Sequence, residues 1–104
     1  ANATTLVVQN VPSSYVQEDL LDLWPADGVD FLHFRPRRSS RSQRNVAVIN
    51  FLSPDRARLF REQWSGVVLP GGRSKRLAIA PAQVQGRDAN LMLLLSADVP
   101  ILFH

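Results

Sequence analysis

Cysteine is absent from this sequence of 104 residues, and histidine is nearly so. The absence of cysteine excludes a disulfide framework, a thiol nucleophile and a zinc site with thiolate ligands. The two histidines, His33 and His104, do not stand at the spacing of metal ligands. We therefore expect neither a metal ion nor a cofactor.

The sequence also lacks a long hydrophobic run. The Leu-rich stretch at residues 91–95 falls far short of the ~20 apolar residues that span a bilayer. The N-terminus has neither a charged start nor an apolar signal region. Together with the missing cysteine, these absences predict an intracellular protein, nuclear or cytoplasmic or both, without membrane contact. Because the sequence does not begin with Met, we expect a fragment of a longer protein.

Lysine is scarce as well, since eleven of the twelve basic residues are Arg, and the formal net charge is +3. A guanidinium group binds two phosphate oxygens at once and stacks on nucleobases, which an ammonium group does less well. The imbalance indicates an anionic partner, with nucleic acid ahead of a membrane surface.

Short β-branched runs alternate with segments of helical periodicity. The expected strands are residues 5–10, 29–34, 46–51 and 77–80, and the expected helices begin near Ser14, Ser53 and Asp88. The order βαββαβ plus a C-terminal third helix predicts an α+β fold. This is a ferredoxin-like sandwich, a four-stranded antiparallel sheet with two helices on one face. We expect one domain with its core at residues 1–86, on which the helix and tail of residues 87–104 pack.

Local signals define the expected helix ends. Ser14 and Gln17 have the spacing of a capping box. Ser53 followed by Pro54 is a favourable N-cap with proline at the first helical position. Gly66 suits the left-handed position that follows the second helix.

The alternation of side chains along each strand assigns them to two faces. Those expected in the helix-covered core are Leu6, Val8, Leu32, Phe34, Ala47, Ile49, Phe51, Leu77 and Ile79. Those expected on the opposite face are Val7, Gln9, Phe31, His33, Val46, Val48, Asn50, Ala78 and Ala80. The second face is too apolar to stay bare in water, so we expect the last helix to cover part of it, with a second molecule as the competing cover.

Two short motifs lie on the expected first and third strands. Residues 44–51 follow the RNA-recognition octamer in their basic first, small fourth, aliphatic sixth and aromatic eighth positions, and residues 6–11 fit its companion hexamer. With the βαββαβ order, these motifs make the chain resemble RNA-recognition-motif domains. Over residues 4–95 it looks most like the Mei-two-like family of RNA-binding regulators. The segments that carry this narrower resemblance are residues 4–12, Tyr15 with 17–21, 30–32, 49–51 with Ser53 and Pro54, 74–75, and 85–86.

The resemblance implies an RNA-recognition domain that binds single-stranded RNA within a larger regulatory protein, but the sequence departs from the pattern. Such domains stack bases on aromatic side chains at positions that are Val7, Val46 and Val48 here. The octamer's usual glycine is Asn45. Each lost stacking contact removes ~1–3 kcal/mol of binding free energy.

Residues 35–44 contain five Arg and no acid, and we expect this loop to bind phosphates. A solvated linker is the alternative, and phosphorylation of its serines would reverse its charge effect. Arg73, Lys75 and Arg76 form a second basic cluster. Phe31 and His33 are either a relocated stacking platform or residues packed under the last helix. The candidate RNA-binding residues are Gln9, Phe31, His33, Arg35, Arg37, Arg38, Arg41, Arg44, Val46, Val48, Asn50 and Arg76.

Two functions remain open from the sequence. The first is binding of single-stranded RNA through the Arg-rich loop and the sheet edge. The second is a protein-interaction or dimerisation domain that has lost the stacking aromatics and uses its apolar sheet face or the C-terminal segment at residues 99–103. We expect no enzyme, because Asp27 and Asp30 have no base or nucleophile beside them, and residues 70–72 form a hairpin turn, not a phosphate-binding loop.

Overall fold

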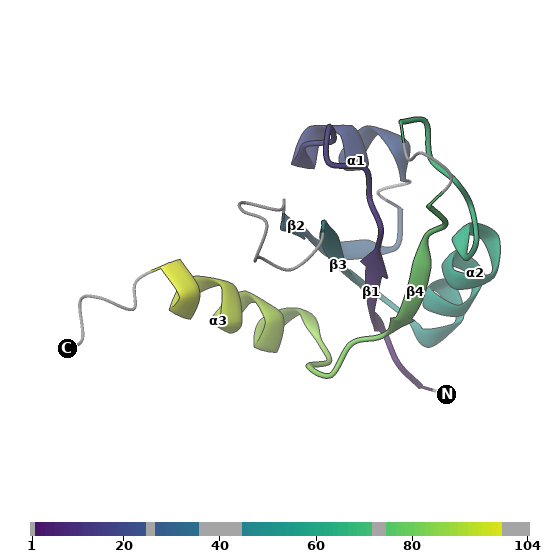
Figure 1. The fold of residues 1–104 in the computed structure, drawn as a ribbon. Coiled ribbons are helices and arrows are strands. Elements are labelled where there is room, and N and C mark those ends of the chain that lie inside the picture. Colours follow the sequence, from purple (N-terminus) through teal and green to yellow (C-terminus); the bar gives the residue numbers. More distant parts are fainter. Residues whose placement is uncertain (1, 25–26, 36–44, 72–74, 99–104) are drawn as a thin grey trace.

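The computed structural model describes residues 2–24, 27–35, 45–71 and 75–98, with side chains as far as Ser96 (Figure 1). The elements in chain order are β1 (Thr5–Gln9), α1 (Gln17–Leu23), β2 (Val29–Arg35), β3 (Val46–Phe51), α2 (Pro54–Trp64), β4 (Ala78–Pro81) and α3 (Arg87–Asp98). This is the predicted βαββαβ order with a third helix at the C-terminal end.

The four strands form one antiparallel sheet in the order β2-β3-β1-β4. The two motif-bearing strands, β1 and β3, are therefore its central pair. In their register Val7 lies opposite Val48 and Gln9 opposite Val46. The sheet order and the two crossing helices confirm the predicted ferredoxin-like fold.

One face of the sheet is covered by α1 and α2 and holds the core. The buried apolar residues are Leu6, Val8, Val11, Leu20, Trp24, Phe34, Ala47, Ile49, Phe51, Ala57, Phe60, Leu69, Leu77 and Ile79. Trp24, which directly follows α1, meets Phe60 of α2 edge to face, with ring centroids 5.2 Å apart. Leu32 is half-buried against the same cluster. The residues predicted to face the helices do so.

Helix α1 begins differently from the prediction. Its N-cap is Val16, whose backbone N–H donates to the Asp19 carboxylate at 2.8 Å. Gln17 instead reaches the outer strand β2, where its amide donates to the Leu32 carbonyl (2.7 Å) and accepts from the Phe34 N–H (2.8 Å). The predicted Ser14–Gln17 capping box is wrong because an edge strand offers a matching donor and acceptor that a side-chain amide satisfies.

Helix α2 begins as the sequence predicts. The Ser53 hydroxyl accepts from the backbone N–H of Arg56 at 3.3 Å, and Pro54 is the first helical residue. Gly66, two residues past the end of α2, has φ 82°. A left-handed backbone of this kind carries almost no steric cost for glycine.

A buried polar cluster at one end of the sheet centres on Asn50 of β3, which is 5% exposed. Its side-chain oxygen accepts from the hydroxyls of Thr5 (2.6 Å) and Thr4 (2.8 Å), and its NH₂ donates to the Asp30 carboxylate at 2.7 Å. The Thr5 hydroxyl in turn accepts from the backbone N–H of Gly86. One amide thus joins β1, β2 and β3 to the segment that leads into α3.

The start of α3 is fixed by two further side-chain amides. Gln85 accepts from the backbone N–H groups of Thr4 (2.9 Å) and Thr5 (3.0 Å) and donates to the carbonyls of Thr5 and Ala82. Asn90, which is buried, donates to the carbonyls of Val84 and Gly86. The segment after β4 therefore continues the pairing with β1 through side chains.

Replacing Asn50 with leucine, a side chain of similar shape, should lower the free energy of unfolding by about 2–4 kcal/mol. The substitution leaves the Thr5 hydroxyl short of its acceptor and the Asp30 carboxylate without its donor in a buried setting. Urea denaturation followed by circular dichroism measures the change. Gln63→Ala, on the exposed side of α2, is the control and should stay within about 0.5 kcal/mol of the parent. Equal stabilities of the two variants would contradict the role given to Asn50.

Candidate nucleic-acid interface

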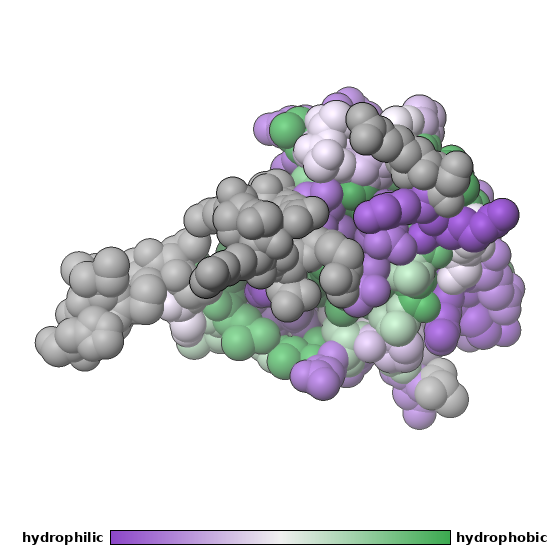
Figure 2. All heavy atoms as spheres, viewed as in Figure 1, coloured by the Kyte–Doolittle hydropathy of each residue, from purple (hydrophilic) through white to green (hydrophobic). Residues whose placement is uncertain are grey.

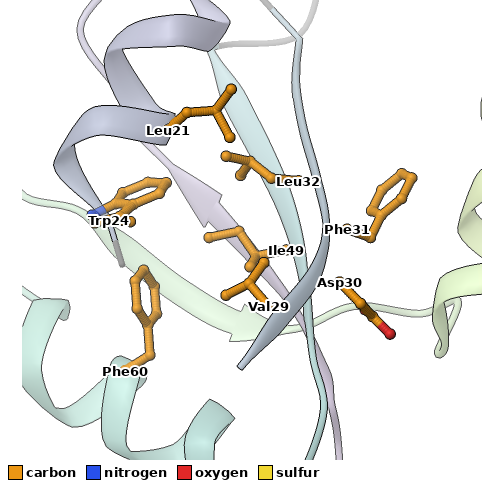
Figure 3. A pocket seen from close by; sticks show the side chains of 8 residues that line it. All are labelled: Leu21, Trp24, Val29, Asp30, Phe31, Leu32, Ile49 and Phe60. Atoms are coloured by element: carbon orange, nitrogen blue, oxygen red, sulfur yellow. The ribbon is translucent and has the colours of Figure 1, made fainter. Parts of the chain in front are cut away.

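The face of the sheet opposite α1 and α2 carries the candidate site residues in cross-strand rows. One row, at the end of the sheet where β2 ends and β3 begins, runs Arg35, Val46, Gln9, Ala78. The next runs His33, Val48, Val7, Ala80. The third contains Phe31, Asn50 and Thr5. Figure 3 shows Phe31 pointing to the opposite side of the strands from Leu32 and Ile49. The register therefore brings seven predicted residues onto one surface.

The three rows differ in access to solvent. In the first row Arg35, Gln9 and Ala78 are exposed, while the members of the second row other than Ala80 are half-buried. Asn50 in the third row is buried and makes three hydrogen bonds inside the protein. A ligand reaches its amide only if the hydrogen bonds with Thr4, Thr5 or Asp30 open. Asn50, which was predicted to contact RNA, therefore stabilises the fold in this structure.

Helix α3 lies beside β2, its main neighbour in the sheet, and extends past the sheet (Figure 1). Leu91 and Leu94 are half-buried, whereas Met92, Leu93 and Leu95 are 63%, 46% and 50% exposed. In the same view, Figure 2 shows hydrophobic surface gathered over α3 and hydrophilic surface over α2. The half of the sheet formed by β1 and β4 stays open, as the exposed Gln9, Ala78 and Ala80 show.

The open half of the sheet contains a shallow groove of about 260 Å³. It is lined by Val7, Gln9, Ala78, Ile79, Ala80, Pro81, Ala82 and Gln83. Its floor is low because alternate residues of β4 are alanine, and the amides of Gln9 and Gln83 stand toward its two ends. Ala82 and Gln83 were not among the predicted site residues, although alanine at every second position from 78 to 82 is a signal in the sequence.

Basic groups lie at the same end of the sheet as Arg35. Arg76, which is exposed, precedes β4, and its carbonyl accepts from the Asn10 amide at 2.9 Å. Its guanidinium donates to the Gly66 carbonyl at 3.1 Å, which holds the side chain near the sheet. Lys75 beside it is also exposed. The predicted site residues Arg37, Arg38, Arg41 and Arg44, and Arg73 of the second cluster, lie outside the described residues.

Arg35 and Asn45 flank the Arg-rich part of the sequence at residues 36–44. Arg35 ends β2 and Asn45 directly precedes β3. The Asn45 carbonyl accepts from the Val11 N–H, just past the end of β1. These two described residues therefore lie at the end of the sheet that carries Gln9 and Arg76.

In the described part of the chain, no group of three or more His, Asp or Glu residues is placed to hold a metal ion. None of its helices is long and apolar enough to cross a membrane.

Comparison with known proteins gives similarity in fold. No protein-family model and no curated protein sequence matches the chain. Among solved structures, the third RRM (RNA recognition motif) domain of Hrb1 is 23% identical with a TM-score of 0.61, over 77% of each chain. The RRM3 domain of Mip6 is 13% identical with a TM-score of 0.59, over 77% of this chain and 94% of that one.

A third similar structure is the Sxl-lethal protein in complex with RNA, 23% identical with a TM-score of 0.60, over 82% of this chain and 50% of that one. All three share the antiparallel sheet and its covering helices with this protein. The chain therefore has the fold of RNA-recognition-motif domains.

Proposed function

We propose that the protein binds single-stranded RNA, through the Arg-rich stretch and the open β1–β4 half of its sheet. The observation that carries the proposal is the row Arg35, Val46, Gln9, Ala78, which joins an exposed cation, an exposed amide and an open groove. The similar structure of the Sxl-lethal protein is a complex with RNA, which supports the same reading.

Affinity in this proposal comes mainly from phosphates. Val7, Val46 and Val48 offer no aromatic face, so base stacking on the central strands contributes little. Arginines that neutralise phosphates release counterions, which makes binding steeply dependent on salt. The amides of Gln9 and Gln83 supply donors and acceptors for a base in the groove. The expected binding is therefore salt-sensitive and weakly sequence-specific.

We further propose that the chain is the RNA-recognition domain of a Mei-two-like regulatory protein that acts inside the cell. The support is the run of matching sequence segments between residues 4 and 95, among them 4–12 and 49–51 with Ser53 and Pro54. Two of these matches have structural tasks here, since Thr4 and Asn50 bond to each other and Ser53 caps α2.

A protein-interaction domain is the second candidate. The observation that favours it is the exposure of Met92, Leu93 and Leu95 along α3, because an apolar surface of this kind commonly meets another protein. The missing stacking aromatics fit the same reading. RNA binding at low salt separates the two candidates.

We expect a triple variant to bind a pool of short single-stranded RNAs more weakly. It replaces Arg37, Arg38 and Arg41 with glutamine. If each arginine neutralises one phosphate, the slope of log K against log salt should flatten by about 0.7 per residue, or roughly 2 in all. Fluorescence anisotropy at several salt concentrations measures both quantities.

The matched control replaces Arg58, Arg61 and Arg87 with glutamine, which removes the same charge from exposed positions on α2 and α3. If the two triple variants weaken RNA binding equally, the loss depends on net charge and not on the position of the arginines, which would contradict the proposal. Absence of RNA binding at low salt would favour the protein-interaction candidate.

A second variant tests the missing stacking surface by restoring it. Val48→Phe places an aromatic ring in the middle row of the open face, between Val7 and His33. Affinity for the RNA pool should rise by roughly 5- to 150-fold, equivalent to ~1–3 kcal/mol for one stacked base. Val48→Leu adds apolar volume without an aromatic face and should leave the affinity nearly unchanged. An equal response to the two substitutions would show that bases do not reach this row.

A further inference from the structure

An apolar pocket of about 220 Å³ opens on the helix-covered side of the sheet, at its β2 edge (Figure 3). Its walls come from α1, α2 and two strands: Leu21, Trp24, Val29, Leu32, Ile49 and Phe60. Leu21 at its mouth is 51% exposed. An apolar cavity of about 150 Å³ is already large enough to bind benzene. The pocket therefore has room for one aromatic or aliphatic side chain from outside.

The edge of the sheet beside the pocket favours insertion of a side chain over addition of a strand. The pairing of β2 with β3 is irregular between Val29 and Phe31, next to the pocket. Farther along β2, the amide of Gln17 already occupies the outward carbonyl of Leu32 and N–H of Phe34. A partner strand would have to displace Gln17 in order to pair there.

The surroundings of the pocket are acidic, although the protein as a whole is basic. Residues 15–31 contain five of the nine acidic side chains and none of the twelve basic ones. Glu18 and Asp22 are exposed on α1 around Leu21. Asp30 also belongs to the lining, but its carboxylate points to the other side of β2, where it accepts from the Asn50 amide (Figure 3). Asp27, nearer α2, is paired with Arg56 at 3.3 Å. A net negative field at the mouth attracts cations and repels the phosphates of RNA.

We propose that this surface, formed by α1 and the first half of β2, binds a basic peptide segment of a partner protein. One bulky apolar side chain of the segment fills the pocket, and flanking Lys or Arg side chains face Glu18 and Asp22. The charge and shape of the pocket mouth specify this partner, and the surface lies apart from the one proposed for RNA. The inference therefore goes beyond the proposed function and does not depend on it.

The fluorescence of Trp24 can report whether the pocket is filled. Trp24 forms part of its wall, and the second tryptophan, Trp64, lies with its ring centroid 6.1 Å from that of Trp24. The indole N–H of Trp24 is buried and has no hydrogen-bond partner in the described structure. The Trp64→Phe variant leaves Trp24 as the one tryptophan of the sequence, so that emission excited at a wavelength that tyrosine does not absorb reports filling of the pocket.

The test titrates a capped peptide, Lys-Arg-Arg-Phe-Arg-Arg-Lys, into the full chain carrying Trp64→Phe. The expected result is a saturable change in Trp24 emission with a dissociation constant in the micromolar range, weakening as salt rises. The same peptide with Ala in place of Phe should bind at least tenfold more weakly, and one with Glu in place of its basic residues should not bind. No saturable change up to millimolar peptide, or equal binding of the Ala peptide, would overturn the proposal.

A pair of charge variants then locates the site. Glu18→Gln with Asp22→Asn should weaken peptide binding by about two- to fivefold per carboxylate and leave RNA affinity unchanged at moderate salt. Asp55→Asn with Glu62→Gln removes the same charge from exposed positions on α2 and should change little. Equal effects of the two pairs would place the peptide elsewhere. If Trp24 emission changes with protein concentration in the absence of peptide, the pocket is filled by a second copy of this chain. That result would overturn the proposal.

Discussion

The side-chain amide of Asn50 is the contact on which the arrangement of this molecule depends most. It is buried where β1, β2 and β3 meet, and it satisfies two hydroxyl donors and one carboxylate acceptor at once. A half-satisfied cluster of this kind would cost several kcal/mol. The geometry of all its members is therefore set together, and Gly86 bonded to Thr5 extends the constraint to the start of α3. The start of α3 is thus held against β1, and the helix then continues beside β2.

The sequence predicted the fold well because its signals are local and repeated. Alternation along residues 46–51 assigned Ala47, Ile49 and Phe51 to the core, and all three are buried. Ser53 and Pro54 correctly predicted the start of helix α2. Helix α1 did not, because Gln17 bonds to β2, fifteen and seventeen residues farther along the chain, and no pattern within one helix reveals such a partner.

The candidate site was harder to predict, and Asn50 shows why. Strand alternation placed it correctly on the face opposite the helices. Its burial comes from residues far away in sequence, since Thr5 precedes it by 45 positions and bonds in turn to Gly86. The groove beside β4 was not predicted, because it is formed by the absence of large side chains. Ala78 and Ala80 carry no charged or polar group that would mark them as binding residues in the sequence. The arginines of residues 36–44 remain a prediction from sequence.

The two outer strands of the sheet both carry an obstacle to further pairing. On β2 the amide of Gln17 occupies a backbone carbonyl and N–H that face outward. On β4 the last residue is Pro81, which has no N–H to donate. Exposed strand edges can pair with strands of other chains and so lead to aggregation. Blocked edges slow this pairing. Gln17 and Pro81 therefore hinder the addition of a further strand at the two edges of this sheet.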